Sequence, residues 1–451
     1  MSEPSYHESQ ADAGTVDEVV VSDTDVGRIA FAAFVGTALE WYDYFLFGTA
    51  AALVFNKLFF TSLDPGVATL ASLGTFGVGF AARPIGAFFF GLLGDRIGRR
   101  PTLIATIVMI GLATGILGLL PTYTSIGIWA PTALVALRLI QGFAVGGEWG
   151  GATTIAIEHA PVEKRARYAA LVQVGSPVGT LMSSGAIALA LLLPASDFDA
   201  WGWRLPFLAA FPLLGVALYI RLKVEESPVF NDLVRLDLRE KTPAAKVFTQ
   251  AWRRLLVAIA AAFLGVGGFY VMNTFVVSYA SNTLGVARQT VVNATLVAAV
   301  VQIVVILFCG RLAERFGPGR VTFWGGLATA AAALPLFWLI DTGSPAAIVF
   351  AVTTGIALVT TTYAVTGALL SELFPPELRY SGVSLGYNIA GALSGFLPFI
   401  ATWMINLTGK SVSWPAVMIL AIVSLITAFG GLIGERMRVH DKAIVRSAET
   451  A

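Results

Sequence analysis

Charged residues are scarce in this sequence. They make up 13% of its 451 residues, whereas 56% are hydrophobic; an ordinary soluble domain carries roughly 25% charged residues. The shortage excludes an ordinary soluble protein and indicates that most of the chain faces lipid. The net charge of +1 does not point to a charged partner, and we expect no nucleic-acid ligand.

Cysteine and histidine are rarer still. The single cysteine, Cys309, excludes an internal disulfide and fits no metal-ligand spacing. The three histidines, His7, His159 and His440, lie away from the middle of the long apolar runs, which removes the usual proton carrier at near-neutral pH. We therefore expect no metal and no cofactor, and any proton coupling has to use carboxylates.

Long apolar runs dominate what is present. Each is near 20 residues or longer, which is enough to cross a bilayer as a helix. Twelve runs are found, with bounds that hold to within a few residues: 29–55, 67–93, 101–121, 126–158, 167–193, 205–222, 255–281, 289–309, 321–340, 345–371, 380–406 and 413–434. The sequence therefore predicts an all-α integral membrane protein with twelve transmembrane helices.

The two halves of the chain resemble each other. The segment Gly91-Leu-Leu-Gly-Asp-Arg-Ile-Gly-Arg-Arg100 has a weaker copy, Gly310-Arg-Leu-Ala-Glu-Arg-Phe-Gly317, which begins 219 residues later. A second pattern, Glu158, Pro161, Glu163 and Arg165, recurs 214 residues later as Glu372, Pro375, Glu377 and Arg379. Internal symmetry of this kind is typical of transporters. It predicts two six-helix bundles.

Basic residues lie mostly on one side of the predicted helices. With both termini inside, the inner segments hold 23 Lys and Arg residues and the outer loops hold four, namely Lys57, Arg204, Arg288 and Lys410. Because translocation leaves basic loops in the cytoplasm, this asymmetry predicts cytoplasmic N and C termini. We expect a multi-pass protein of the plasma (inner) membrane.

The polar segments predict the domain organisation. The first residues are acidic and lack the basic start and short apolar core of a signal peptide, which indicates a disordered cytoplasmic tail. The longest polar interruption separates six helices from six and is interpreted as a cytoplasmic linker. The expected order is a tail at 1–28, an N-terminal bundle at 29–222, a linker at 223–254, a C-terminal bundle at 255–435 and a tail at 436–451.

Five ionisable residues interrupt the predicted helices, all of them in the first half: Glu40, Asp43, Arg83, Arg138 and Glu148. A charge at the bilayer centre costs about 2.5–3.5 kcal/mol on insertion scales, so such residues are usually functional. Glu40 and Asp43 lie one helical turn apart and share a face. A buried carboxylate can take up a proton and become neutral, so Glu40, Asp43 and Glu148 are candidates for proton coupling.

A purely structural interpretation stays open for the same residues. Asp43 with Arg83, and Glu148 with Arg138, would then be buried ion pairs that hold helices in place. Two acids on one turn repel each other unless one is protonated or a cation is near. This repulsion favours a functional role for Glu40 and Asp43.

Neutral polar and aromatic side chains supply further candidate solute contacts. An arginine fork suits a carboxylate, and aromatic rings suit a ring or a quaternary ammonium group. The matching helices of the second half carry neutral polar groups only. The candidate substrate-binding residues are Arg83, Arg138, Gln141, Trp41, Tyr44, Tyr270, Asn273, Gln302, Tyr387 and Asn388.

The glycine-rich loop after the second predicted helix suits a latch between helix ends. Asp95 can accept hydrogen bonds from the start of a neighbouring helix, and the adjacent arginines can pair with carboxylates. Such contacts can form in one conformation and break in another. The predicted latch comprises Gly91, Asp95, Arg96, Gly98, Arg100 and Glu158, with Glu314, Arg315 and Glu372 in the second copy.

Several of these segments resemble the signature motifs of the major facilitator superfamily. Gly91–Arg100 resembles its loop motif, and the segment from Arg138 to Glu148 resembles its fourth-helix motif. The metabolite:proton symporter family within it is similar in four further segments, namely Leu39–Asp43, Arg83–Gly86, Gly146–Gly151 and Trp201–Phe207. The resemblance extends from about Arg28 to Glu435.

The resemblance implies two six-helix bundles around a central site that opens alternately to each side. It implies proton symport of a small carboxylate, such as 2-oxoglutarate, citrate or shikimate, or of an osmolyte such as proline or betaine. Carried over by motif, Arg204 joins Arg83 as a residue that serves an anionic solute or its gate. The second loop copy departs from the family pattern, because Pro318 and Gly319 replace the basic pair, which weakens any latch in that half.

Other activities are less consistent with the residues. Gly382-Val-Ser-Leu-Gly386 matches the pattern of a serine hydrolase elbow, but that chemistry needs a strand before it and Asp and His after it. We therefore do not expect an enzyme. A passive facilitator of the same solutes and a transport-derived sensor remain alternatives. We expect a functional monomer whose partners are a small solute, protons and the lipid bilayer.

Overall fold

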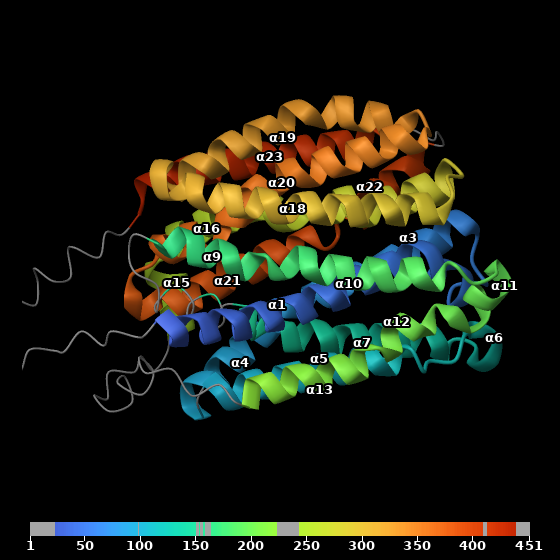
Figure 1. Ribbon diagram of the computed structural model, residues 1–451, viewed down its shortest axis with the longest axis horizontal. Coiled ribbons are helices and arrows are strands. Elements are labelled where there is room, and N and C mark those ends of the chain that lie inside the picture. The colour runs from blue at the N-terminus through green and yellow to red at the C-terminus, as the bar shows by residue number, and fades with distance from the viewer. Residues whose placement is uncertain are drawn as a thin grey trace, which may run out of the picture.

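The computed structural model describes residues 23–97, 99–149, 153, 157, 164–222, 243–408 and 413–438. Within this part of the chain all regular structure is helical. Nine of the described helical segments are long and apolar enough to cross a membrane, and the segment Pro101–Leu117 is a shorter apolar helix. The helices run along the long axis of the molecule (Figure 1).

The first half contains the helices up to residue 222. Their bounds are α1 (Asp23–Ala50), η1 (Ala51–Phe55), α2 (Asn56–Leu58), α3 (Pro65–Ala81), α4 (Arg83–Ile97), α5 (Arg99–Leu117), α6 (Tyr123–Ile126), α7 (Trp129–Gly146), α9 (Arg165–Gln173), α10 (Gly175–Ala190), α11 (Ala195–Asp197), η3 (Phe198–Gly202), α12 (Arg204–Leu208) and α13 (Ala210–Leu222), where η marks a π-helical turn.

The second half repeats this arrangement. Its helices are α15 (Pro243–Gln250), α16 (Trp252–Tyr270), η4 (Val271–Phe275), α17 (Val276–Ser278), η5 (Tyr279–Thr283), α18 (Arg288–Phe316), α19 (Pro318–Asp341), α20 (Pro345–Leu373), α21 (Pro376–Ser394), α22 (Leu397–Thr408) and α23 (Trp414–Arg436). Over the residues that the structure describes, each predicted apolar run is therefore occupied mainly by one helix or by consecutive helical segments.

Helices extend past two of the predicted domain boundaries. Helix α1 begins at Asp23, inside the predicted tail, and α15 and the start of α16 lie inside the predicted linker. Hydropathy marks where lipid begins, whereas a helix can continue into water as long as its backbone bonds are made. The remaining parts of the predicted tails and linker (1–22, 223–242 and 439–451) lie outside the described residues.

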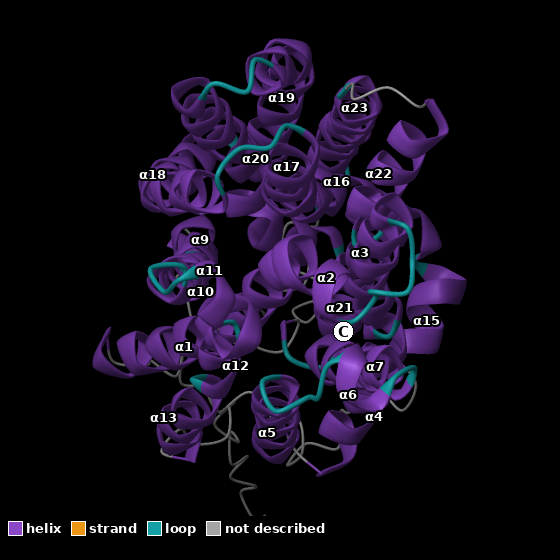
Figure 2. Ribbon diagram, turned by 90° about the vertical axis from the view of Figure 1, so that its right-hand side faces the viewer, coloured by secondary structure: helices purple, strands orange, loops and turns teal. Residues whose placement is uncertain are grey.

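The two halves pack against each other as two groups of helices. In Figures 1 and 2 helices α18, α19, α20 and α23 form one side, and α1, α5, α7 and α13 form the other. Helices α9 and α10 of the first half contact α18, and α3 and α4 contact α21. These two seams bring the middle of the first half against the middle of the second.

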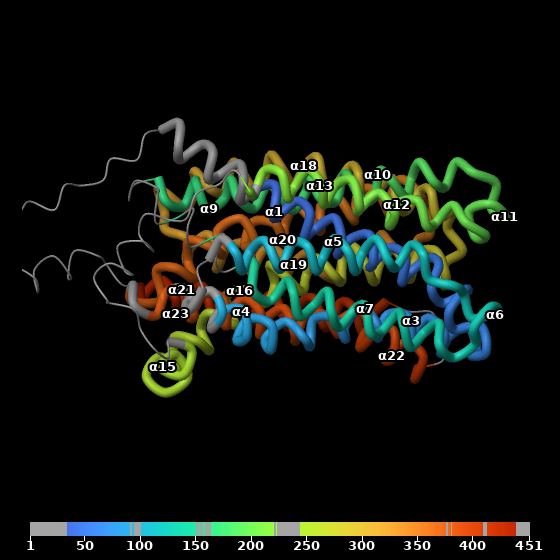
Figure 3. Tube along the Cα trace, turned by 90° about the horizontal axis from the view of Figure 1, so that it is seen from below, coloured from blue at the N-terminus to red at the C-terminus, as the bar shows by residue number. Residues whose placement is uncertain are grey.

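The two ends of the molecule differ. Helix α15 lies at one end and the short helices α6 and α11 lie at the other, as Figures 1 and 3 both show. We name these the α15 end and the α11 end. The repeated loop motif meets the α15 end, where Gly317, with a φ of 90°, ends α18 directly before α19 begins.

Glycine lets α7 approach α3 and α4 until the backbones touch. A Cβ atom added to Gly142 would lie 1.7 Å from the carbonyl oxygen of Gly79, and one added to Gly146 would lie 2.1 Å from that of Arg83. In lipid, where no hydrophobic force drives helices together, such close packing is a main source of association. Gly142 and Gly146 therefore allow α7 to pack tightly against α3 and α4.

We expect Gly142→Ala to lower the unfolding temperature of the detergent-purified protein. One methyl group overlaps a backbone oxygen that cannot rotate away, and overpacking of this kind costs about 1–3 kcal/mol or more. The matched control is Gly185→Ala, because a Cβ at this helical glycine of α10 has nothing within 4 Å. Equal unfolding temperatures for the two variants would contradict the close-packing argument.

Candidate functional site

A buried ion pair connects α1 with α4 near the middle of the molecule. Nη2 of Arg83 lies 3.1 Å from Oε1 of Glu40, and each side chain is 1% exposed. Nε of the same arginine donates to Oδ1 of Asn388 at 3.1 Å. The amide of Asn388 in turn donates to the carbonyl of Gly146 at 3.2 Å. Arg83 is therefore shared between a carboxylate of the first half and an amide of the second.

A second buried pair connects α1 with α7. Nη1 of Arg138 lies 3.1 Å from Oδ2 of Asp43. The other carboxylate oxygen, Oδ1, accepts hydrogen bonds of 2.5 Å from both the hydroxyl of Thr114 and the amide of Gln141. Gln141 also accepts a bond from Arg138 at 3.3 Å. Asp43 is thus held by three donors, whereas Arg83 is the one ionic partner described for Glu40.

These contacts correct the pairing that the sequence left open. The hypothesis joined Asp43 with Arg83 and Glu148 with Arg138, but the structure pairs Arg83 with Glu40 and gives Arg138 to Asp43. Glu40 and Asp43 share a helix face, as predicted, yet they meet cations from two different helices. The pairing was wrong because sequence periodicity defines the face of a helix and not the neighbours that it meets.

Aromatic rings surround both arginines. The guanidinium of Arg83 lies 5.1 Å from the ring centre of Tyr44 and 5.7 Å from that of Tyr387. The guanidinium of Arg138 lies 4.2 Å from the ring centre of Phe47 and 5.2 Å from that of Tyr44. Ring faces attract cations, so Tyr44 stabilises both charges where water is absent.

Glu148 lies beside the two acids of α1. It is 3% exposed and lines, with Glu40, Asp43 and Thr114, a cavity of about 30 Å³ between α1, α5, α7 and α13. A cavity needs roughly 10–15 Å³ on this measure to hold one water molecule. The three carboxylates predicted for proton coupling are therefore gathered around a space of one or two water molecules.

The remaining predicted contacts of the first half lie in the same region. Trp41 is buried, with its ring centre 5.3 Å from Phe45 and 5.6 Å from Tyr363 of the second half. Because Tyr363 belongs to α20, Trp41 faces the seam between the halves. The structure therefore brings Trp41 and Tyr44 to the side of α1 that meets the second half.

The second half contributes neutral groups to this seam. The ring of Tyr270 lies 4.7 Å from that of Phe80, one turn from Arg83. Gln302 is fully buried, and neither its amide nitrogen nor its amide oxygen has a hydrogen-bond partner within the described structure. The same holds for Oδ1 of Asn273. Buried polar atoms normally have partners, so these two side chains are candidates for contact with a polar solute.

Arg204 does not join the cluster. Its guanidinium donates to the carbonyls of Gly118 and Leu120 at 3.0 and 2.5 Å and stacks 4.5 Å from the ring centre of Trp203. Gly118 follows Thr114 by one helical turn toward the α11 end. The contacts described for Arg204 thus close the end of α5, and the motif resemblance that grouped it with Arg83 does not bring the two together.

The latch residues of the second copy make two ion pairs at the α15 end. Glu314 pairs with Arg167 of the first half at 3.0 Å. Glu372 pairs with Arg438 at 2.6 Å, inside the second half. Arg315 lies against the ring of Phe316. The expected weakness of this latch is thus offset by Arg167, which lies outside the motif.

The first copy of the latch is described only in part. Gly91, Asp95 and Arg96 lie in α4 and Arg100 in α5, but the placement of their side chains is not described. Gly98 and Glu158 lie outside the described residues. A contact of the kind predicted for Asp95 is seen in the second half, although not at its counterpart Glu314. There the carboxylate of Glu435 accepts a hydrogen bond from the N–H of Gly319, at the start of α19, at 2.8 Å.

Sequence reasoning missed Thr114, Arg167 and Glu435. Thr114 is an ordinary residue of an apolar helix, and only the fold places it against Asp43. Arg167 and Glu435 lie in polar helix ends, where charge alone does not distinguish a latch from a topology signal. Position within one turn of the duplicated pattern that ends at Arg165 is the signal that would have found Arg167.

An all-α membrane protein with ion pairs buried at the seam between two repeated helix groups has the architecture of a secondary transporter. The family model of the Major Facilitator Superfamily matches residues 33–362 and 271–446. The chain belongs to this superfamily, and it is a transporter rather than an enzyme.

Its relatives are transporters of small metabolites. The shikimate transporter of Escherichia coli (strain K12) is 37% identical over 422 residues, which cover 91% of this chain and 96% of that protein. The proline/betaine transporter of Salmonella typhimurium is 33% identical over 424 residues, which cover 91% of this chain and 84% of that protein.

Solved structures share the fold. A partially occluded inward-open conformation of the xylose transporter XylE from E. coli superposes with a TM-score of 0.70 at 18% identity, covering 91% of this chain and 97% of that chain. The proton:xylose symporter XylE bound to 6-bromo-6-deoxy-D-glucose gives a TM-score of 0.68, also at 18% identity, covering 92% and 95%.

We expect Arg138→Gln to destabilise the detergent-purified protein strongly. Removing one partner of a buried ion pair leaves an uncompensated charge and costs about 3–5 kcal/mol. The double variant Asp43→Asn with Arg138→Gln should unfold at a higher temperature than Arg138→Gln alone, because no charge is then left unpaired.

The matched control for this prediction is Arg167→Gln. Its ion pair with Glu314 has a similar length, 3.0 Å, but Arg167 is 45% exposed, and an exposed pair contributes only about 0–1 kcal/mol. Thermal unfolding of the four proteins checks the ranking. An equal loss in Arg138→Gln and Arg167→Gln would show that burial of the Asp43 pair is not what stabilises it.

Proposed function

We propose that the protein is a proton-coupled symporter that takes up a small carboxylate of the shikimate type. One observation carries the proposal: the buried guanidinium of Arg83 is shared between Glu40, which can take up a proton, and Asn388 of the other half. The 37% identity to the shikimate transporter supports a carboxylate as the solute.

Protonation of Glu40 is the step that couples proton and solute. A neutral Glu40 no longer satisfies the charge of Arg83, and an uncompensated guanidinium in a low-dielectric site is costly. A carboxylate of the solute can then take the place of Glu40 at Arg83, in the bidentate geometry that arginine favours. Neither ligand binds well without the other, which is the condition for symport.

Charge conservation sets the expected stoichiometry. One proton on Glu40 removes one negative charge from the cluster, and one solute carboxylate restores it. The net charge that crosses the membrane is then zero for a monocarboxylate and +1 for a zwitterion such as proline or betaine. Asp43 keeps its charge in this scheme, because Arg138, Thr114 and Gln141 all donate to it.

Alternating access requires that the contacts across the seam open and close. We propose that residues 29–222 and 255–435 rock as two bundles about the cluster, and that the pair of Arg167 with Glu314 closes the α15 end in the described conformation. The excess of basic residues supports a cytoplasmic position for the α15 end and both termini, with the protein in the inner membrane. We further propose a monomer that needs no cofactor besides the proton.

Transport into vesicles tests the proposal. Uptake of shikimate, 2-oxoglutarate, citrate, proline and betaine is measured with an imposed pH gradient, an imposed membrane potential, or both. Electroneutral symport of a monocarboxylate predicts accumulation driven by the pH gradient and unaffected by the potential. A zwitterion would also respond to the potential, at about 2.3 kcal/mol per charge per 100 mV. Equal uptake with and without either gradient would indicate a passive facilitator instead.

We expect Glu40→Gln to abolish accumulation while counterflow exchange of the same solute continues. The amide matches the shape of protonated Glu40 but cannot release a proton. The empty carrier can then no longer return to the outward-facing state, which net accumulation requires. The solute-loaded carrier can still change sides in both directions, which is all that exchange requires. Uptake and exchange are measured side by side in vesicles of matched protein content.

Asp199→Asn is the control for Glu40→Gln. Asp199 is a half-exposed carboxylate near the α11 end, paired with Arg288 at 3.2 Å, and its amide variant should accumulate solute like the wild type. Full accumulation by Glu40→Gln would remove Glu40 from the coupling role. Loss of both uptake and exchange would assign it to solute binding instead.

A further inference from the structure

A polar vestibule opens at the α11 end, well away from the charge cluster. It has a volume of about 550 Å³, within the range of small-molecule sites. Its walls come from α2, α3 and the loop between them in the first half and from η4, α17, η5 and α22 in the second. The vestibule residues that carry the argument are Asn56, Lys57, Thr69, Asn282 and Asn406.

The vestibule is separated from the cluster along both helices that lead to it. Asn56 follows Asp43 by 13 residues, and Thr69 precedes Arg83 by 14 residues, each about 20 Å along a helix. Between them, the ring of Phe76 lies 5.1 Å from the ring of Tyr270. A solute in the vestibule is therefore not in contact with Arg83.

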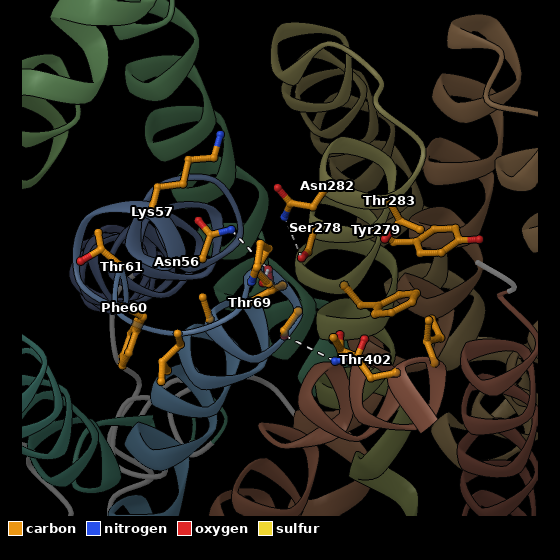
Figure 4. Close-up of a pocket in the computed structure, with 17 residues that line it drawn as sticks. Asn56, Lys57, Phe60, Thr61, Thr69, Ser278, Tyr279, Asn282, Thr283 and Thr402 are labelled. Carbon is orange, nitrogen blue, oxygen red and sulfur yellow. Dashed lines mark hydrogen bonds between the residues drawn. The ribbon is translucent and has the colours of Figure 1, made fainter. Parts of the chain in front are cut away.

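The lining has the chemistry of a recognition site. Figure 4 shows Asn56, Lys57 and Thr61 on one wall and Ser278, Asn282 and Thr283 on the facing wall. Besides three aromatic and several aliphatic residues, the lining consists of hydroxyl and amide side chains with one cation, Lys57, and none of its described residues is acidic. Such a surface favours a hydroxylated anion over a cation.

One buried acceptor in the lining has no partner. Asn56 is 9% exposed, and its amide nitrogen donates to Thr69 at 3.3 Å. Its Oδ1 has no hydrogen-bond partner within the described structure. A buried acceptor left without a donor is costly, and a solute hydroxyl would supply the donor. Lys57, the next residue, offers a charge for the carboxylate of the same solute.

The vestibule also lies where the two halves meet. Asn282 donates to the carbonyl of Ala52 at 2.9 Å, and Asn406 lies 3.4 Å from that of Gly66. The turns η1 and η4 occupy equivalent places in the two halves, and π-helical turns are frequent at functional sites. Movement of the halves would thus reshape the vestibule.

We propose that this vestibule is a second solute site, which binds a hydroxylated monocarboxylate before it reaches the charge cluster. Lys57 holds the carboxylate, and Asn56 accepts a hydrogen bond from a ring hydroxyl. The proposal rests on the function proposed above and deepens it, because it assigns selection for hydroxylated anions to the α11 end. Since this end faces outward in the proposed orientation, the site acts on entry only.

Initial rates of shikimate transport in the two directions test the vestibule. Lys57→Gln and Asn56→Leu are each compared with the wild type in right-side-out and in inverted membrane vesicles. We expect each variant to raise KM about three- to tenfold for entry from the α11 end, which is the effect of losing one polar contact. The maximal rate should stay within about twofold, and KM from the α15 end should not change.

Arg288→Gln is the matched control. It removes a positive charge near the same end, but Arg288 is absent from the vestibule lining and pairs with Asp199. Its KM should equal that of the wild type in both directions. Because Arg288 also acts electrostatically on Lys57, the deciding comparison includes Asn56→Leu: an equal rise in Arg288→Gln and Lys57→Gln with none in Asn56→Leu would reduce the effect to general surface charge and overturn the site.

The other outcomes are equally decisive. Unchanged KM values in Lys57→Gln and Asn56→Leu, alongside active wild type, overturn the vestibule and leave the proposed symport intact. A change of the maximal rate alone, or an equal change from both sides, would show that these residues act on the transport cycle and not on capture. A wild type that transports no hydroxylated carboxylate overturns the proposed function, and the vestibule site with it.

Discussion

The structure depends on the need to satisfy the positive charge of Arg83, whose side chain is buried. Glu40 supplies the counter-charge at 3.1 Å, Asn388 an amide oxygen, and Tyr44 and Tyr387 the faces of their rings. Glu40 and Tyr44 belong to α1 and Tyr387 and Asn388 to α21, so the arginine, itself in α4, holds α1, α4 and α21 relative to one another. The contact of Gly146 with the carbonyl of Arg83 keeps α7 in the same arrangement. A change at this one side chain therefore alters contacts with helices of both halves.

The sequence was sufficient to find the residues of the cluster but not their partners. An ionisable residue inside an apolar run stands out because lipid makes it costly, and Glu40, Asp43, Arg83 and Arg138 all prove to be buried and paired. Which acid meets which arginine depends on how α4 and α7 are rotated against α1. That rotation is set by contacts such as Gly142 on Gly79, whose geometry no hydropathy pattern contains.

The same limit explains what was missed. The spans followed from the lengths of the apolar runs, but the vestibule is assembled from helix ends, such as those near Asn56, Asn282 and Asn406, that are far apart in sequence and have no shared motif. Arg204 shows the reverse case. Its motif resembled that of a functional arginine. In the structure, however, Arg204 donates to the carbonyls of Gly118 and Leu120 and does not contact the charge cluster.

The described ion pairs within the first half are stronger than the described contacts across the seam between the halves. The two described ion pairs that are fully buried, at Arg83 and Arg138, lie inside the first half, and breaking such a pair costs about 3–5 kcal/mol. Across the seam the described contacts are weaker, for example the hydrogen bond of Arg83 to the amide oxygen of Asn388 and the exposed pair of Arg167 with Glu314, which contribute about 1.5–3 and 0–1 kcal/mol. A carrier that opens the seam between its halves in every cycle needs weak contacts there, because the free energy of each contact that breaks adds to the barrier for opening. A carboxylate at position 388 would compete with Glu40 for Arg83 and hold the halves together, so a neutral amide there is consistent with the proposed rocking of the two bundles.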